Sequence, residues 1–195
     1  MFWAANYQVL WNRVLRDIAA AHVHNMDDSA RLFALVNLSM ADAGITAWDT
    51  KFHYVSWRPV TAIQEGDHDG NPRTDGDANW QPLINNPNYP EYTSGANNVS
   101  GAATRALALF FGTDEMTFSV TTTNPAALQQ VRTYNRFSDA AADVVEARIY
   151  QGIHFRFADV QARKQGRHVA NWVFFHFLRS VDDDDCDEHD DDDDE

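Results

Sequence analysis

Apolar residues recur at helical spacing along most of this chain, and this pattern constrains the fold more than any other feature. Five segments show it, and no run shows sustained period-two alternation. We therefore predict an all-α fold, a helical bundle of about five main helices. Asp27, Asp28 and Ser29 predict a helix start, and the polar stretch 65–92 predicts a long loop. The expected helices cover residues 3–21, 27–51, 96–111, 135–150 and 158–178.

Composition predicts one domain followed by a tail. The chain has 195 residues, 44% of them hydrophobic, which is enough for one full core. Residues 1–179 are expected to form a helical domain, and 180–195 an acidic disordered tail. Residues 182–195 hold 12 of the 29 acidic residues and no basic one, so the formal charge of −14 belongs mostly to this tail.

The same composition limits partners and location. The basic residues are dispersed, and two of the 15 are lysine, which argues against a nucleic-acid-binding face. Cys186 is the single cysteine, so no intrachain disulfide can form. No stretch approaches the ~20 apolar residues of a membrane span. We expect a soluble protein, with secretion or a periplasmic location left open.

Two cations lie on helix faces that should pack inward. At about 100° per residue, Lys51 follows Phe33 by about five turns, and Arg148 falls close to the direction of Phe137. A buried cation is costly unless an anion meets it. The alternative for each is an internal salt bridge, and the candidate partners are Asp42, Asp139 and Asp143.

Three further residues stand where helices begin or end. Ser94 and Gly95 precede the third expected helix, where free amides and the helix dipole favour an anion. An ordinary serine cap followed by glycine would give the same pattern. His154 follows Gly152, which should end the fourth helix, and a capping or surface histidine is the alternative there. No histidine pair has zinc-site spacing.

Considered together, these residues predict one oxyanion site at helix ends. Three cations, a hydroxyl beside a glycine and a histidine can hold and attack a tetrahedral phosphate or vanadate. The next position, where an acid/base residue is expected, is Ala96. The predicted site residues are Lys51, Arg58, Ser94, Gly95, Arg148 and His154.

The site residues lie in three segments, which read KFHYVSWRP (51–59), YPEYTSG (89–95) and RIYQGIHFRF (148–157). Their content and order resemble the three-part signature of the type 2 phosphatidic acid phosphatase and vanadium haloperoxidase superfamily. The resemblance covers roughly residues 30–178. The stretches WRPVTAI and GIHFRF are similar to the soluble, haloperoxidase-like branch.

This resemblance implies a role for each residue. His154 would be the apical group, the ligand of vanadium in a haloperoxidase or the phosphorylated nucleophile in an acid phosphatase. Ser94 would add a hydroxyl hydrogen bond, and Gly95 a backbone N–H. The oxyanion's equatorial oxygens would be bound by Lys51, Arg58 and Arg148. Both chemistries pass through the same five-coordinate geometry, so both readings stay open.

Three functions follow as hypotheses. The first is a vanadium-dependent haloperoxidase-like enzyme, with vanadate as cofactor and peroxide and halide as substrates. The alternative is an acid phosphatase that hydrolyses phosphomonoesters through a phosphohistidine and needs no cofactor. The second alternative is a degenerate oxyanion-binding protein without turnover, because the family carries a histidine where this chain has Ala96. The family also tends to carry an aspartate four residues after the apical histidine, whereas Asp159 comes five after.

Length bears on the assembly. Soluble haloperoxidase-like proteins are usually much longer, with helices before the first motif, so we expect this chain to be a fragment. Missing helices would leave part of the core uncovered. A homodimer or a partly exposed apolar face is the expected consequence.

Overall fold

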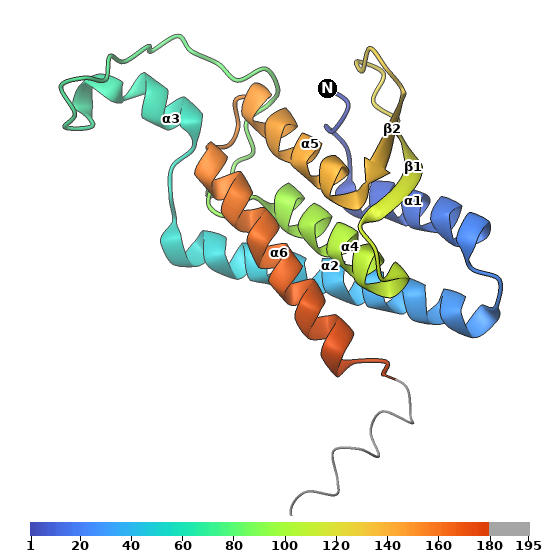
Figure 1. Cartoon of the computed structure of the whole chain (residues 1–195). Helices are drawn as coiled ribbons and strands as arrows, with labels where there is room; N and C mark the ends of the chain where they lie inside the picture. Colours follow the sequence, from blue (N-terminus) through green and yellow to red (C-terminus); the bar gives the residue numbers. More distant parts are fainter. Residues whose placement is uncertain (180–195) are drawn as a thin grey trace, which may run out of the picture.

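The computed structural model describes residues 1–179, and the predicted acidic tail lies outside them. The fold is mostly helical, as predicted (Figure 1). None of the helices in this part of the chain is long and apolar enough to cross a membrane. The elements are α1 (Tyr7–His22), α2 (Met26–Tyr54), α3 (Pro59–Gln64), the short 3₁₀ helix η1 (Gly66–His68), α4 (Gly95–Phe111), β1 (Glu115–Thr121), β2 (Val131–Arg136), α5 (Phe137–Tyr150) and α6 (Arg156–His176).

Helix α4 lies at the centre of the bundle and packs against α1, α2, α5 and α6 (Figure 1). Val99, Ala102, Ala103 and Ala106 of this helix are all buried, while Phe110 packs on the same core but is partly exposed. Most of these side chains are small, so the neighbouring helices can approach α4 closely. This packing brings the N-terminal end of α4 close to the ends of its neighbours.

Two glycines set the distance between α4 and α6. A Cβ on Gly166 would lie 2.0 Å from the carbonyl oxygen of Asn98, and one on Gly101 would lie 2.5 Å from the carbonyl oxygen of Arg163. Backbone atoms close both positions, so no larger residue fits without moving a helix. The contact therefore fixes α6 relative to the start of α4.

Replacing Gly166 with alanine is expected to lower the free energy of unfolding by at least about 2 kcal/mol, because the two helices must separate to admit the methyl group. Gly44→Ala on α2 is the matched control, since no heavy atom lies within 4 Å of its Cβ position. That variant should gain up to about 1 kcal/mol from helix propensity. Urea denaturation measures both, and equal stability of the two variants would contradict the close packing.

The hairpin of β1 and β2 is an element that the helical pattern missed. Phe118 pairs with Tyr134 and Val120 with Arg132 in an antiparallel register. Phe118 and Val120 are buried and the residues between and beside them are exposed, so the expectation of no period-two alternation was wrong for this segment. Seven residues are too few to stand out against the helical signal. Because β2 ends at Arg136, α5 begins two residues later than expected.

Asparagine caps decide where the first two helices begin. The Oδ1 atoms of Asn6 and Asn25 accept hydrogen bonds from backbone amides three residues on, at 3.0 and 2.7 Å. Helix α1 therefore begins at Tyr7 rather than near residue 3, and α2 begins at Met26, just before the predicted acidic cluster. Helix α2 continues to Tyr54, so that Lys51 lies in its last turn. The predicted loop 65–92 is irregular apart from η1.

Two tryptophans fill the core where α1 meets its neighbours. Trp3 and Trp11 are both 0% exposed and stack with ring centres 6.1 Å apart. Each indole N–H is satisfied, because Trp3 Nε1 donates to Asp143 Oδ2 at 2.8 Å and Trp11 Nε1 donates to Ser100 Oγ at 2.9 Å. The bonds tie the N-terminal segment to α5 and α4, which carry parts of the candidate site.

Candidate active site

The six predicted site residues lie at or near the ends of α2, α3, α4, α5 and α6, and Figure 1 shows how these helices are arranged. All except Gly95 are buried, with at most 9% of each residue exposed. They are Lys51 in the last turn of α2, Arg58 just before α3, Ser94 and Gly95 at the start of α4, Arg148 in the last turn of α5, and His154 just before α6.

Lys51 is held against the segment that precedes α4. Its Nζ donates to the carbonyl oxygens of Pro90 and Glu91, both at 2.8 Å, and lies 5.3 Å from the ring centre of Tyr89. Burial, followed by the charge of Arg58, lowers the pKa of Lys51 to about 7. Two of its three N–H donors are used, so one is left for a ligand oxygen. An anion beside Lys51 would raise this pKa again and keep the amine charged.

Arg58 joins the same segment to the turn before α6. Its Nε donates to the carbonyl oxygen of Tyr89 at 3.0 Å, and its Nη1 to that of Ile153 at 2.8 Å. The same Nη1 lies 3.4 Å from Nε2 of His154. Pro59 follows as the first residue of α3, which fixes the backbone at this point. The guanidinium and the imidazole are therefore direct neighbours.

Arg148 keeps an unpaired donor. Its Nη1 donates to Gln151 Oε1 at 3.0 Å, while its buried Nε has no partner. The alternative of an internal salt bridge is not realised, because no ion pair within residues 1–179 involves Lys51, Arg58 or Arg148. Asp143, one of the expected partners, accepts hydrogen bonds from the hairpin instead. The three cations thus lie together without a carboxylate that pairs with them.

Ser94 and Gly95 form an open start of α4. Ser94 is the N-cap residue, yet its hydroxyl makes no capping bond and accepts a hydrogen bond from Asn97 Nδ2 at 3.2 Å. The alternative of an ordinary serine cap is therefore not what this chain adopts. No heavy atom lies within 4 Å of the position that a Cβ on Gly95 would take. The first amides of α4 remain available to an anion, which the helix dipole favours.

His154 is oriented by Glu91, a residue that sequence reasoning missed. His154 Nδ1 lies 2.8 Å from Glu91 Oε1, and the same oxygen accepts a hydrogen bond from Phe155 N at 3.0 Å. Burial, and after it the charges of the three cations, lowers the pKa of His154 well below its ordinary value. The ring is therefore neutral. Its Nδ1–H donates to Glu91, and Nε2 keeps a lone pair beside Arg58.

Glu91 is fully buried, and burial raises its pKa against the lowering effect of the Phe155 N–H. Its position is fixed because Lys51 and Arg58 bind carbonyls of the segment 89–91. A signal for it was present in the sequence, because it is the one charged residue in YPEYTSG. A charge inside an otherwise neutral motif beside three predicted cations indicates a buried partner.

Asp159 is a second buried carboxyl, and it lies near Ser94. Its Oδ1 accepts a hydrogen bond from Asn97 Nδ2 at 2.7 Å, and its Oδ2 has no partner. Burial raises the pKa of Asp159 to about 7, against the lowering effects of Ser94 and Arg148. The carboxyl that contacts the His154 ring is that of Glu91, not Asp159. Asp159 instead places a carboxyl that changes charge near neutral pH at the start of α4.

Replacing Asp159 with asparagine is expected to stabilise the fold by roughly 1–3 kcal/mol at pH 8 and by much less at pH 4. The raised pKa means that the folded state holds this proton up to about pH 7, whereas the unfolded state releases it near pH 4. The wild type therefore loses stability as pH rises through this window, and asparagine removes that loss while still accepting from Asn97. Urea denaturation at the two pH values measures the difference. Asp49→Asn, an exposed change on α2, should show none of it.

Unpaired polar atoms gather around this site. In the part of the chain that the structure describes, six buried side-chain atoms have no hydrogen-bond partner. Each belongs to a site residue or to a residue connected to one through hydrogen bonds. Such atoms are rare in folded proteins, so their concentration here indicates a place for a polar ligand. They are Glu91 Oε2, Asn97 Oδ1, Asn98 Oδ1, Arg148 Nε, Gln151 Nε2 and Asp159 Oδ2.

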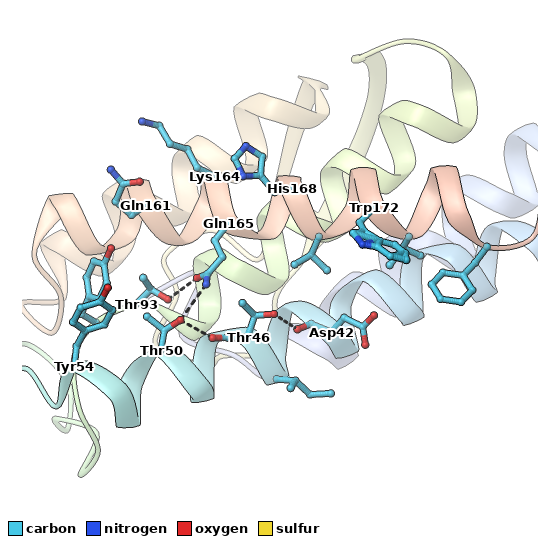
Figure 2. A pocket seen from close by; sticks show the side chains of 15 residues that line it. Asp42, Thr46, Thr50, Tyr54, Thr93, Gln161, Lys164, Gln165, His168 and Trp172 are labelled. Carbon is cyan, nitrogen blue, oxygen red and sulfur yellow. Dashed lines mark hydrogen bonds between the residues drawn. The ribbon is translucent and has the colours of Figure 1, made fainter.

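A groove of about 860 Å³ runs between α2 and α6 beside the site (Figure 2). Gln165 projects from α6 toward α2 and donates to Thr50 Oγ1 at 3.0 Å, and Thr93 Oγ1 donates to Gln165 Oε1 at 2.9 Å. Thr93 immediately precedes Ser94, so this hydrogen-bonded chain connects the groove to the start of α4. Trp172 lies farther along the groove and is half exposed.

Known proteins match much of this chain in sequence. A family model described as the VCPO second helical-bundle domain matches residues 31–183. Among curated proteins, the vanadium chloroperoxidase of Curvularia inaequalis is 34% identical over 105 residues, which cover 49% of this chain and 16% of that protein. The chain thus spans a minor part of the length of this relative.

Solved structures agree with the fold. A crystal structure of a bacterial vanadium-dependent iodoperoxidase is 31% identical with a TM-score of 0.77, covering 89% of this chain and 42% of that one. A crystal structure of a holo-type bacterial vanadium-dependent chloroperoxidase is 16% identical with a TM-score of 0.54. The match covers 84% of this chain and 46% of the chloroperoxidase chain, and it shows the shared fold. Because the family model covers most of the chain, the protein belongs to the family of VCPO second helical-bundle domains, in the haloperoxidase-like branch.

Proposed function

We propose that this chain binds vanadate and uses hydrogen peroxide to oxidise a halide. The observation that carries the proposal is the set of three buried cations, unpaired with any carboxylate in residues 1–179, beside a neutral histidine. Three buried positive charges are costly alone and favourable around an oxyanion. Iodide is the halide of first choice, since a similar solved structure is an iodoperoxidase.

The residues present fit a tetrahedral oxyanion. Lys51 and Arg148 each keep a donor for an oxygen, and Arg58 keeps further N–H groups. The space beside Gly95 gives access to the first amides of α4. His154 Nε2 is an unprotonated nitrogen, the form in which imidazole binds a metal.

When bound, vanadate supplies a Lewis acid that activates peroxide toward attack by halide. The chain's residues would bind the vanadate and neutralise its charge. Nε2 of His154 would bind it, and Glu91 keeps the ring orientation by accepting a hydrogen bond from Nδ1–H. The cations neutralise the anion's charge and restrict its rotation. Ala96 cannot transfer a proton, so a proton on the bound group would be handled by Asp159, Lys51 or solvent.

The proposal is tested by loading the purified chain with orthovanadate and following peroxide-dependent iodide oxidation as triiodide absorbance. We expect turnover that needs both vanadate and peroxide and that competing phosphate suppresses. The Arg148→Gln variant tests the role of the cations. It removes the one with the unpaired Nε, and it should lose most of the rate of iodide oxidation. Absence of vanadate-dependent oxidation at every loading would reject this function.

Phosphomonoester hydrolysis is the second candidate, and the neutral His154 favours it as well. An imidazole with a free Nε2 among three cations is a competent nucleophile toward phosphorus. Rapid-quench trapping during turnover of p-nitrophenyl phosphate would then give a phosphohistidine at His154. If steady turnover occurs without that adduct, the phosphohistidine mechanism is excluded. If neither activity is present but vanadate binds, the chain is a binding protein without turnover.

A further inference from the structure

A second cavity, of about 490 Å³, lies between α4, α5 and α6, and it shares no lining residue with the oxyanion site. Arg105 projects into it from α4, and Arg163 and Arg167 project from α6. Asp114 and Ser138 also line the cavity. We refer to the three arginines and this cavity as the arginine pocket.

The arginine pocket carries uncompensated positive charge. In the part of the chain described by the structure, no ion pair involves Arg105, Arg163 or Arg167. Arg105 Nε donates to Asn171 Oδ1 at 2.6 Å. The carboxylate of Asp114 is already bound by neighbouring groups of β2 and α5. Each guanidinium has five donors, so most of those in the pocket are available to an anion.

Two of these arginines repel one another. Arg163 and Arg167 are four residues apart on α6, where like charges lie on the same face and destabilise a helix slightly. Arg105 approaches the same space from α4. A ligand with several carboxylates on a flexible backbone would relieve this repulsion at all three positions. A small monoanion would relieve it only in part.

The chain itself carries a segment with that chemistry. Residues 182–195 contain 12 acidic residues, no basic one and almost no apolar side chain. The rest of the chain has 15 basic and 17 acidic residues, so it carries no net positive charge. The arginine pocket gathers three of those basic residues at one cavity.

The segment can reach the pocket. Helix α6 ends at His176, nine residues after Arg167, which corresponds to about 14 Å along the helix axis. A chain of sixteen residues extends up to roughly 50 Å. Helix α6 bears two of the arginines and leads into the segment, so the start of the segment lies close to the pocket. The effective concentration of carboxylates at the pocket is therefore high.

We propose that the arginine pocket binds the chain's own acidic C-terminal segment, residues 182–195. The contact is electrostatic, so it weakens as salt shortens the screening length. It covers a face of α4, α5 and α6 away from the oxyanion site, and it gives the acidic segment a defined intramolecular partner.

Cys186, the one cysteine of the chain, allows a direct test with the full-length protein. A nitroxide attached to it broadens the amide signals of nearby residues in the ¹⁵N-labelled protein. We expect broadening centred on Gly112, Thr113 and Ser138 at the pocket, with little at α3. The broadening should disappear in about 0.5 M salt, where the screening length falls to a few ångströms.

Charge-removing variants make the test specific. Arg163→Gln with Arg167→Gln should abolish the broadening at the pocket. Arg13→Gln with Arg16→Gln, an equal change of charge on exposed positions of α1, should leave it intact. Broadening that is unaffected by the first pair, or that is centred elsewhere, overturns the proposal.

A mixture of nitroxide-labelled protein and ¹⁵N-labelled protein without nitroxide checks the source of the segment. Pocket broadening in this mixture would show that the segment comes from a second copy and would overturn intramolecular binding. Titration with pyrophosphate measures whether a small polyanion competes with the segment for the pocket. Displacement of the labelled segment from the pocket supports the proposal, whereas pyrophosphate binding without any prior broadening there overturns it. These results do not depend on the oxyanion site, so they stand apart from the proposed function.

Discussion

His154→Ala is expected to weaken orthovanadate binding by on the order of 100-fold or more and to abolish vanadate-dependent iodide oxidation. The ring supplies the one unprotonated nitrogen that faces the cations, because Nδ1–H is engaged by Glu91 and Nε2 lies 3.4 Å from Arg58. Changes at residues that merely orient a metal ligand already cost about 10–100-fold in affinity. Removing the ligand itself should cost more. Calorimetric titration with orthovanadate measures the change directly.

Two further variants show whether the effect belongs to coordination. Glu91→Gln keeps a hydrogen-bond acceptor beside His154 Nδ1 but removes the negative charge, so we expect a loss of about tenfold. His168→Ala, an exposed histidine on α6 in the groove, should bind as the wild type does. Unchanged orthovanadate affinity in His154→Ala would sink both enzymatic readings, because each requires the anion at this ring.

The helices of this chain were predictable because their buried apolar residues recur at helical spacing. Lys51 fell on the buried stripe of α2 because that helix buries one side, whereas α4, at the centre of the bundle, buries every residue from 97 to 104. The hairpin was missed, since its strands are short and β2 runs without a break into α5 at Phe137. The helix starts were misplaced by a few residues, because asparagine caps outweighed the acidic cluster after Asn25.

The candidate site was predictable where charge recurs at helix ends and not where contacts are made across the fold. Lys51 and Arg148 stand out in the sequence because cations on inward faces need an explanation, and His154 stands out because it follows the end of a helix. Glu91 did not stand out, because its role depends on the turn before α6, 63 residues away. Asp159 was judged by its spacing from His154, whereas the fold places it against the start of α4. Spacing along one helix predicts which residues share a buried face. Contacts between residues of different helices can be known only once the packing of the helices is known.

The second prediction concerns the position that departs from the superfamily pattern. Ala96→His is expected to raise the turnover of whichever activity the chain has by roughly 10²–10⁴, the usual contribution of a positioned acid/base group. Ala96 is the second residue of α4, directly after Gly95, and it is partly exposed beside the open helix start. An imidazole there could donate a proton to a bound oxygen or leaving group. The rate of iodide oxidation and of p-nitrophenyl phosphate hydrolysis should be measured on the same preparation.

Ala96→Gln is the matched control, because it adds similar bulk and a hydrogen-bond donor but cannot exchange a proton near neutral pH. The gain should follow proton transfer rather than binding, so orthovanadate affinity should stay nearly equal in the two variants. An ordinary histidine titrates near pH 6.5, and the gain should change with pH through that region in the histidine variant alone. A similar rate increase in Ala96→Gln would assign the effect to packing.

If Ala96→His brings no gain although orthovanadate still binds, another group already moves the proton, and Asp159 is the nearest candidate. Its carboxyl is buried beside the residues that start α4, and its pKa of about 7 lets it hold or release a proton under the conditions of assay. Asp159→Asn would then lower turnover in the wild-type background while leaving affinity for the anion in place. If Ala96→His does bring the gain, Asp159 does not transfer the proton in turnover. Asp159→Asn should then change how stability depends on pH but should leave the improved rate unchanged.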